Sequence, residues 1–235
     1  YGLVRYADEI VDTFHDYDKA KLLADFKQET YKAIYEKISL NPILHAFQKT
    51  VHDYGIDLEL IAAFFNSMEM DLDGKRYDHH LFEKYIYGSA EVVGLMCLKV
   101  FCEGDEVQYE KLKSPAKKLG AAFQKVNFLR DMKSDYDERG RVYFPGLTFH
   151  AFNNEVKKDI EKNIQDDFDS AFQGIQQLPL KARAGVYLAY KYYMVLFEKI
   201  KRANAEIVSR ERIRVSNAKK MRILLKTYFA HSLNL

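Results

Sequence analysis

The 235-residue chain has few of the residues that cross-link or interrupt a fold. Its only two Cys, Cys97 and Cys102, exclude a disulfide scaffold, and we expect both on one helix, facing different ways. With 11 Gly and 4 Pro, long helices can run without interruption. The most apolar segment, Val92 to Phe101, is about half the roughly 20 residues that a membrane-spanning helix needs, and it contains Lys99. We therefore expect no transmembrane segment.

The chain also lacks an excess of charge of either sign. Its 36 basic and 34 acidic residues give a net charge of +2, which provides no general attraction to nucleic acid or to an anionic membrane. The 16 Phe and 17 Tyr are enough to fill a core, so a disordered chain is excluded. We expect a globular protein without a nucleic-acid partner.

The positions of the helix-starting and helix-ending residues predict an all-α protein of eight to ten helices. Asp18 is suited to an N-cap, and Asn41-Pro42 and Ser114-Pro115 are typical of helix starts, where proline is tolerated in the first turn. No strand-type alternation, repeat or polar linker interrupts the chain, so residues 1–235 are expected to form a single domain. The predicted helices cover residues 1–16, 18–39, 41–55, 57–72, 78–102, 114–135, 152–177, 180–208 and 216–231.

Two carboxylates near the N-terminus form a first candidate site. Asp8 and Asp12 are one helical turn apart, so they share a face and repel each other. That cost is relieved if a cation lies between them, and hard oxygen donors suit Mg²⁺. The alternative is a solvated acidic face, since Asp12 and Asp16 repeat the same spacing by chance.

A second candidate is more specific. Gln124, Asn127, Asp131 and Asp135 follow one another at intervals of three or four residues, so they form a stripe along one helix. Because the rest of this helix is largely apolar, the stripe either faces solvent or lines a polar cavity.

The loop that follows carries donors suited to phosphate oxygens, namely Arg139, Arg141 and Tyr143. If the two acidic helices face each other, each can hold Mg²⁺, and the ions together can bind a diphosphate. Loss of diphosphate would generate an allylic cation, which requires an apolar cavity. The small and apolar residues of the segment 88–98 are suited to one wall of that cavity, and equally to a buried core helix.

These motifs resemble those of the squalene/phytoene synthase family, the head-to-head prenyltransferases. The similarity is strongest from Leu119 to Pro145, and shorter matches cover Arg5 to Asp12 and Tyr85 to Gly94. Met68 to Leu72 and Arg210 to Val215 match more loosely. The resemblance extends over nearly the whole chain, and the second acidic motif is most like that of bacterial phytoene synthases.

The resemblance implies an isoprenoid synthase fold, a helical bundle around a central cavity. It implies Mg²⁺, with Mn²⁺ as a substitute, and prenyl diphosphate substrates. The first interpretation is a phytoene synthase that condenses two geranylgeranyl diphosphates through prephytoene diphosphate. The alternative is a squalene or dehydrosqualene synthase acting on two farnesyl diphosphates, with NADPH needed only for squalene. A third is a non-catalytic assembly factor, which retention of the carboxylates disfavours.

Site residues are implied by the same resemblance. The implied Mg²⁺ ligands are Asp8, Asp12, Asn127, Asp131 and Asp135. The implied catalytic residues are Asp8, Asp12, Asp131, Asp135 and Gln124. The implied substrate contacts are Tyr1, Arg5, Tyr85, Arg130, Arg141, Tyr143, Tyr193 and one of Arg210 and Arg212, between which the sequence leaves the choice open.

Some expectations concern the surroundings of this domain. The family has a segment before the first Asp motif that helps to close the site, and we expect residues 1–235 to lack this segment, whether it is absent from the protein or removed from it. We expect a cytoplasmic protein, with peripheral membrane association as an open alternative because the product would be a lipid; the oligomeric state stays open. Asp71 is interpreted as part of a helix end or as a cavity residue, and Asp167, within an acidic run, as part of a solvated face.

Overall fold

Helices account for most of the chain. The computed structural model describes residues 1–72, 77–140 and 142–232, and within these ranges no β-strand occurs, which confirms the all-α prediction. The helices in chain order are α1 (Gly2–Thr13), α2 (Lys19–Glu36), α3 (Pro42–Tyr54), α4 (Leu58–Leu72), α5 (His79–Ile86), the π-helix η1 (Tyr87–Glu91), α6 (Val92–Phe101), α7 (Glu106–Arg139), the 3₁₀-helix η2 (Phe149–Ala151), α8 (Asn154–Ile175), α9 (Leu180–Arg202), α10 (Ala205–Arg210) and α11 (Asn217–Ser232).

Side-chain caps fix several of these starts. Asp18 accepts a hydrogen bond from the backbone N–H of Lys21, and the side chain of Asn41 accepts two at the start of α3. The prediction that a helix begins at Ser114-Pro115 was wrong: α7 begins at Glu106, where Asp105 provides the cap.

Pro115 therefore lies inside a helix, where proline normally removes a hydrogen bond and crowds the preceding turn. Packing between helices explains its presence. A Cβ added to Gly174 of α8 would lie 2.4 Å from the Pro115 ring, so the ring occupies space that the glycine leaves.

The predicted helix over residues 180–208 is divided in the structure. A break after Arg202 separates α9 from α10.

The segments α5, η1 and α6 follow one another without a break, over the span predicted as one helix. A π-helical turn at Tyr87–Glu91 interrupts the regular α-helical hydrogen bonds, and such turns are frequent at functional sites. Gly88 lies in this turn, where an added Cβ would lie only 2.4 Å from the backbone oxygen of Ala63 in α4. The glycine thus allows η1 to approach α4 closely.

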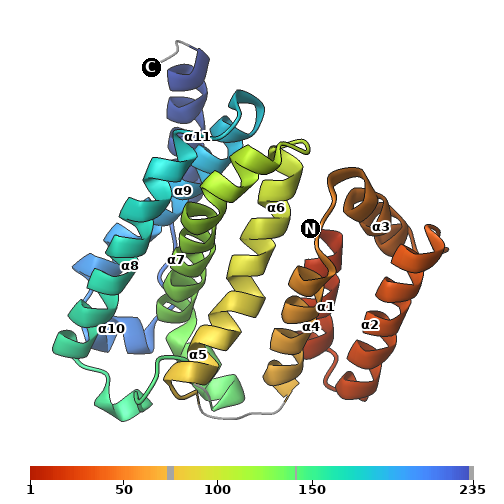
Figure 1. Cartoon of the computed structure of the whole chain (residues 1–235). Coiled ribbons are helices and arrows are strands. Elements are labelled where there is room, and N and C mark those ends of the chain that lie inside the picture. The colour runs from red at the N-terminus through yellow and green to blue at the C-terminus, as the bar shows by residue number, and fades with distance from the viewer. Residues whose placement is uncertain (73–76, 141, 233–235) are drawn as a thin grey trace.

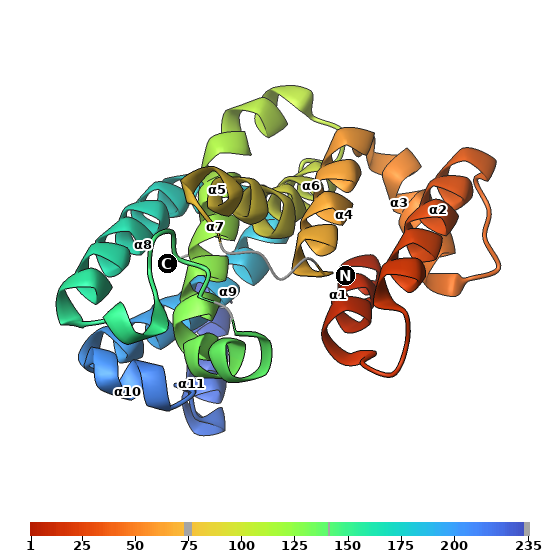
Figure 2. The same cartoon turned by 90° about the horizontal axis from the view of Figure 1, so that it is seen from below.

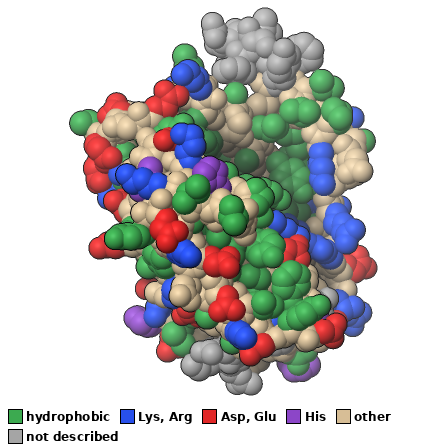
Figure 3. All heavy atoms as spheres, turned by 90° about the vertical axis from the view of Figure 1, so that its right-hand side faces the viewer, with side chains coloured by type: hydrophobic (Ala, Val, Ile, Leu, Met, Phe, Trp, Pro, Cys, Tyr) green, Lys and Arg blue, Asp and Glu red, His purple; other side chains and the backbone are tan. Residues whose placement is uncertain are grey.

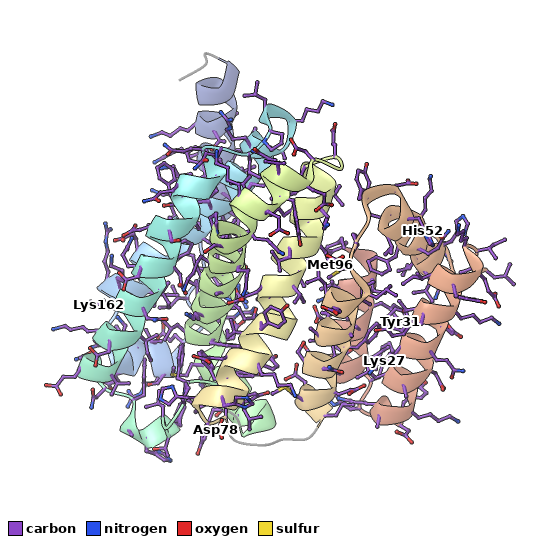
Figure 4. The ribbon with its side chains drawn as sticks, viewed as in Figure 1. Lys27, Tyr31, His52, Asp78, Met96 and Lys162 are labelled. Atoms are coloured by element: carbon purple, nitrogen blue, oxygen red, sulfur yellow. The ribbon has the colours of Figure 1, made fainter. Side chains whose placement is uncertain are left out.

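The helices form two groups on either side of α6 (Figures 1 and 2). On one side α1 to α4 share a hydrophobic core with α6, which includes the buried Met96. Figure 4 shows Tyr31 and Lys27 on α2, where the Tyr31 ring packs against Phe65 and Lys27 pairs with Glu69, both on α4. On the other side α7 to α10 enclose a second core. The two groups face each other across α6, and the sides that face each other line the cavities described below.

A buried ion cluster joins α7 to α8. Asp167 is only 2% exposed, and its carboxylate accepts hydrogen bonds from Lys118 at 2.8 Å and Lys125 at 2.6 Å. The prediction that this acidic residue belongs to a solvated face was wrong, because two lysines of α7 supply the opposite charge that burial requires.

The mixed charge of the surface agrees with the balanced numbers of acidic and basic residues in the composition. Acidic and basic side chains are interspersed on the face shown in Figure 3, which is hollowed in its upper half. None of the helices within the described ranges combines the length and the apolar character that a bilayer crossing requires.

Candidate active site

A polar cavity of about 490 Å³ lies where the two helix groups meet. Two pairs of carboxylates line it, Asp8 and Asp12 from α1 and Asp131 and Asp135 from α7. These pairs are about 120 residues apart in the sequence, and the fold brings them to one cavity. Its other lining residues are Val4, Arg5, Val11, Met68, Asp71, Tyr85, Ser89, Gln124, Asn127, Phe128, Arg130, Ser134, Tyr143 and Arg212.

Asp8 is held in an environment that disfavours its charge. Burial is the largest cause, and the carboxylates of Asp12 and Asp71 add repulsion, so the pKa of Asp8 rises from 3.8 to about 7. Arg5 acts in the opposite direction, and it also pairs with Glu9 one turn along α1. A cation bound beside Asp8 would relieve this repulsion.

Asp131 is surrounded by arginines. The Nε of Arg130 donates to its Oδ1 at 3.0 Å, and the Nε of Arg212 pairs with the same oxygen at 2.8 Å. Arg212 lies in the extended segment after α10 and lines the cavity. Arg210 is the last residue of α10, and its largely exposed side chain pairs with Glu206 at 2.9 Å. Of the two candidates for diphosphate binding, the structure therefore places only Arg212 in the polar cavity.

Tyrosines complete one wall. The hydroxyl of Tyr85 donates to Asp71 at 2.8 Å, and burial, followed by the charge of Asp71, raises the pKa of Tyr85 well above its usual value. Tyr143 stacks on the ring of Phe128 with centroids 4.1 Å apart and on Tyr85 at 5.4 Å. These contacts fix both hydroxyl-bearing rings beside the acidic residues.

A second, apolar cavity of about 750 Å³ adjoins the first. Its walls are formed mainly by α6, α7 and α9. Five residues line both cavities: Val4, Asp8, Ser89, Gln124 and Asn127. At this junction the Tyr193 hydroxyl donates to the Asn127 side chain at 3.2 Å, and the Tyr193 ring stacks on Phe123 at 3.9 Å. A polar head bound in one cavity can thus continue as an apolar chain in the other.

The donors of the polar cavity are suited to Mg²⁺ only together with a further ligand. Among the residues that the structure describes, no three His, Cys, Asp or Glu side chains are close enough to enclose an ion. Mg²⁺ does not need such a cage, because it binds through one or two carboxylates and completes its coordination with water and phosphate oxygens. The two carboxylate pairs, with repulsion concentrated at Asp8, fit Mg²⁺ bound with a diphosphate.

Most residues implied by the family resemblance meet in these cavities. Those in the polar cavity are Arg5, Asp8, Asp12, Tyr85, Gln124, Asn127, Arg130, Asp131, Asp135, Tyr143 and Arg212. Tyr193 lies in the apolar cavity. Tyr1, which is 98% exposed, and Arg210 line neither. Arg141 lies outside the described residues.

Two polar lining residues were not singled out from the sequence. Ser134 lies three residues after Asp131, on the same helical face, and donates to the Asp131 carbonyl at 2.9 Å. Ser89 lies one turn after Tyr85 in the π-helical turn and donates to the Tyr85 carbonyl at 2.7 Å. The spacing from a predicted site residue was the signal that could have identified each.

Comparisons of the sequence with known proteins point to one family. The sequence model of the family described as squalene/phytoene synthase matches residues 1–219. The 4,4'-diapophytoene synthase of Staphylococcus haemolyticus is 24% identical, over 95% of this chain and 82% of its own length. Phytoene synthase 1 of Solanum lycopersicum, a chloroplastic protein, is 27% identical over 99% of this chain, which spans only 60% of that relative's length.

Solved structures share the fold. A dehydrosqualene synthase in complex with ligand is similar with a TM-score of 0.76 at 18% identity, over 99% of this chain and 84% of that one. The squalene synthase HpnC from Alicyclobacillus acidocaldarius is similar with a TM-score of 0.73 at 18% identity, over 85% of this chain and 80% of that one. The fold of this chain is thus the isoprenoid synthase fold of these structures.

Proposed function

Because the chain belongs to the squalene/phytoene synthase family of head-to-head prenyltransferases, we propose that it condenses two geranylgeranyl diphosphates to phytoene. The observation that carries the proposal is the junction of the two cavities. A polar space with two carboxylate pairs opens directly onto an apolar space of about 750 Å³, as a substrate with a charged head and a long hydrocarbon chain requires.

Three arginines supply the positive charge for the diphosphate. Arg5, Arg130 and Arg212 line the polar cavity from three different segments. Their guanidinium groups donate paired hydrogen bonds to phosphate oxygens, which are stronger than neutral hydrogen bonds. Arg130 and Arg212 donate to Asp131 in this structure, so binding of a diphosphate would exchange one set of charge-assisted bonds for another.

Mg²⁺, when bound by Asp8, Asp12, Asn127, Asp131 and Asp135, supplies Lewis-acid stabilisation of the leaving diphosphate. The chain's own side chains position and protect the reacting carbons. Tyr193 orients Asn127 through its hydrogen bond. The apolar walls of α6, α7 and α9 exclude water from the allylic cation.

The double bond of the second substrate attacks this cation, and proton loss closes a cyclopropane to give prephytoene diphosphate. Loss of the second diphosphate and rearrangement of the ring, followed by proton loss, give phytoene. The departing diphosphate can take the proton, so no side-chain base is required.

The alternative function is that of a squalene or dehydrosqualene synthase, with NADPH as hydride donor for squalene. It is favoured by the similarity to a diapophytoene synthase and to a dehydrosqualene synthase structure.

The test supplies the protein with Mg²⁺ and with farnesyl or geranylgeranyl diphosphate, with and without NADPH, and identifies the hydrocarbon by mass spectrometry. Phytoene from the longer substrate is expected. Squalene or dehydrosqualene from the shorter one would replace the first proposal with the alternative, and no hydrocarbon from either would refute both. Asp131→Asn should abolish turnover, whereas Asp166→Asn, on the exposed side of α8, should not.

A further inference from the structure

One glycine of the apolar cavity has no packing role. Gly185 lies inside α9, where glycine is less favourable than alanine. Gly185 is exposed at the wall of the apolar cavity, and a Cβ added there meets no atom within 4 Å. The other helical glycines of the described chain would each place a Cβ 3.0 Å or less from a neighbouring atom: Gly2, Gly88, Gly94, Gly120 and Gly174. Close helix packing therefore explains those five and does not explain Gly185.

Gly185 lies about two thirds of the way along the cavity wall. The α9 residues that line the cavity extend from Tyr193, beside the polar junction, to Lys181 at the other end. A rise of about 1.5 Å per residue places Gly185 about 12 Å and Lys181 about 18 Å from Tyr193 along the helix axis. Near that far end Lys181 pairs with Glu103 at 3.2 Å.

The length of a prenyl chain can be compared with these positions. An extended chain advances about 1.2 Å per bond, so a C5 unit of four bonds spans about 4.8 Å, a farnesyl chain about 14 Å and a geranylgeranyl chain about 19 Å. A farnesyl chain that starts at the polar junction thus ends about 2 Å beyond Gly185, whereas the whole of a fourth C5 unit lies beyond it. A helical side chain leans toward the helix N-terminus, so one at position 185 would extend toward Ala182 and into this space.

We propose that Gly185 sets the substrate length by keeping the apolar cavity open for a fourth C5 unit. This inference rests on the proposed function, since it concerns the same cavity and the same class of substrate. No protein atom occupies the space next to Gly185, so this space is open to a chain bound in the apolar cavity. It favours a geranylgeranyl over a farnesyl substrate.

The test compares wild-type protein with Gly185→Leu and with Gly185→Ala as a matched control. Binding of non-ionising farnesyl and geranylgeranyl thiodiphosphates is measured by calorimetry in the presence of Mg²⁺. Gly185→Leu should lose at least about tenfold in affinity for the longer analogue, as expected when a hydrophobic pocket rejects a longer group. Its affinity for the shorter analogue, which extends only about 2 Å beyond Gly185, should fall by a smaller factor, and Gly185→Ala should bind both like the wild type.

The ratio of the two affinities within one variant is independent of how much of the protein is folded. Equal losses for both analogues, or no loss for the longer one, would overturn the inference. So would a wild-type protein that fails to bind the longer analogue. The expected ratios in a protein that forms no hydrocarbon would refute the proposed function and leave the role of Gly185 standing.

Discussion

Replacing Asp8 by Asn should stabilise the metal-free protein at pH 8 while it abolishes activity. The carboxylate of Asp8 is half-buried beside Asp12 and Asp71, and its pKa is raised from 3.8 to about 7. Between these two values the folded state binds more protons than the unfolded state, so the free energy of unfolding falls as the pH rises from about 4 to 7. Asn keeps the shape of the side chain and removes its charge.

The magnitude follows from the size of the shift. The rise of the Asp8 pKa from 3.8 to about 7 corresponds to about 4 kcal/mol, at 1.36 kcal/mol for each pKa unit. Above pH 7 the free energy of unfolding of the wild type is lower by this amount. We expect Asp8→Asn to raise the free energy of unfolding by about 2–4 kcal/mol at pH 8, and to change it by less than about 0.5 kcal/mol at pH 4. The charge that would hold a metal is thus a cost to the metal-free fold.

Urea unfolding at both pH values, with a chelator present, measures this difference. Asp16→Asn removes an exposed carboxylate that follows the end of α1 by three residues. It should change the free energy of unfolding by less than about 0.5 kcal/mol at either pH. Adding Mg²⁺ with inorganic diphosphate should stabilise the wild type and have less effect on Asp8→Asn. Destabilisation of Asp8→Asn at pH 8, or an equal change at both pH values, would refute the reasoning.

Two further predictions concern the arginines and the buried ion cluster. Arg212→Gln should weaken binding of Mg²⁺-diphosphate by about 10–100-fold, which corresponds to the loss of a hydrogen bond to a charged group. Arg210→Gln should leave this affinity unchanged. Calorimetry with inorganic diphosphate measures the affinity of both variants. Asp167→Ala should lower the free energy of unfolding by about 3–5 kcal/mol, because it leaves the charge of Lys125, whose side chain is 11% exposed, without its partner; Lys118, at 49% exposed, contributes little. Asp166→Ala should cost less than about 0.5 kcal/mol by urea unfolding, and a similar cost at both positions would contradict the cluster's role.

The sequence predicted those parts of the fold that depend on local chemistry. Asp18 and Asn41 cap their helices as predicted, because capping needs only a few neighbouring residues. Pro115 misled the prediction because its place inside α7 depends on Gly174 of another helix. The π-helical turn before α6 also depends on tertiary packing, since Gly88 allows contact with α4. Neither partner can be inferred from the adjacent sequence.

The same distinction applies to the site. The stripe from Gln124 to Asp135 lies on one helix, so its spacing alone predicted a shared face, and all four polar residues of the stripe line the polar cavity. The choice between Arg210 and Arg212 depends on where α10 ends and how the next segment runs, which local spacing does not fix. The burial of Asp167 depends on lysines 42 and 49 residues away.

The two cavities share only five lining residues, and this has a consequence for how new products can arise. Substitutions along α6 and α9 can reshape the hydrocarbon space without touching the carboxylates and arginines of α1 and α7. Ionisation chemistry and product size can then vary independently under selection, in nature or in a mutant library. A screen by product mass could therefore restrict its diversity to the apolar wall and leave the catalytic half constant.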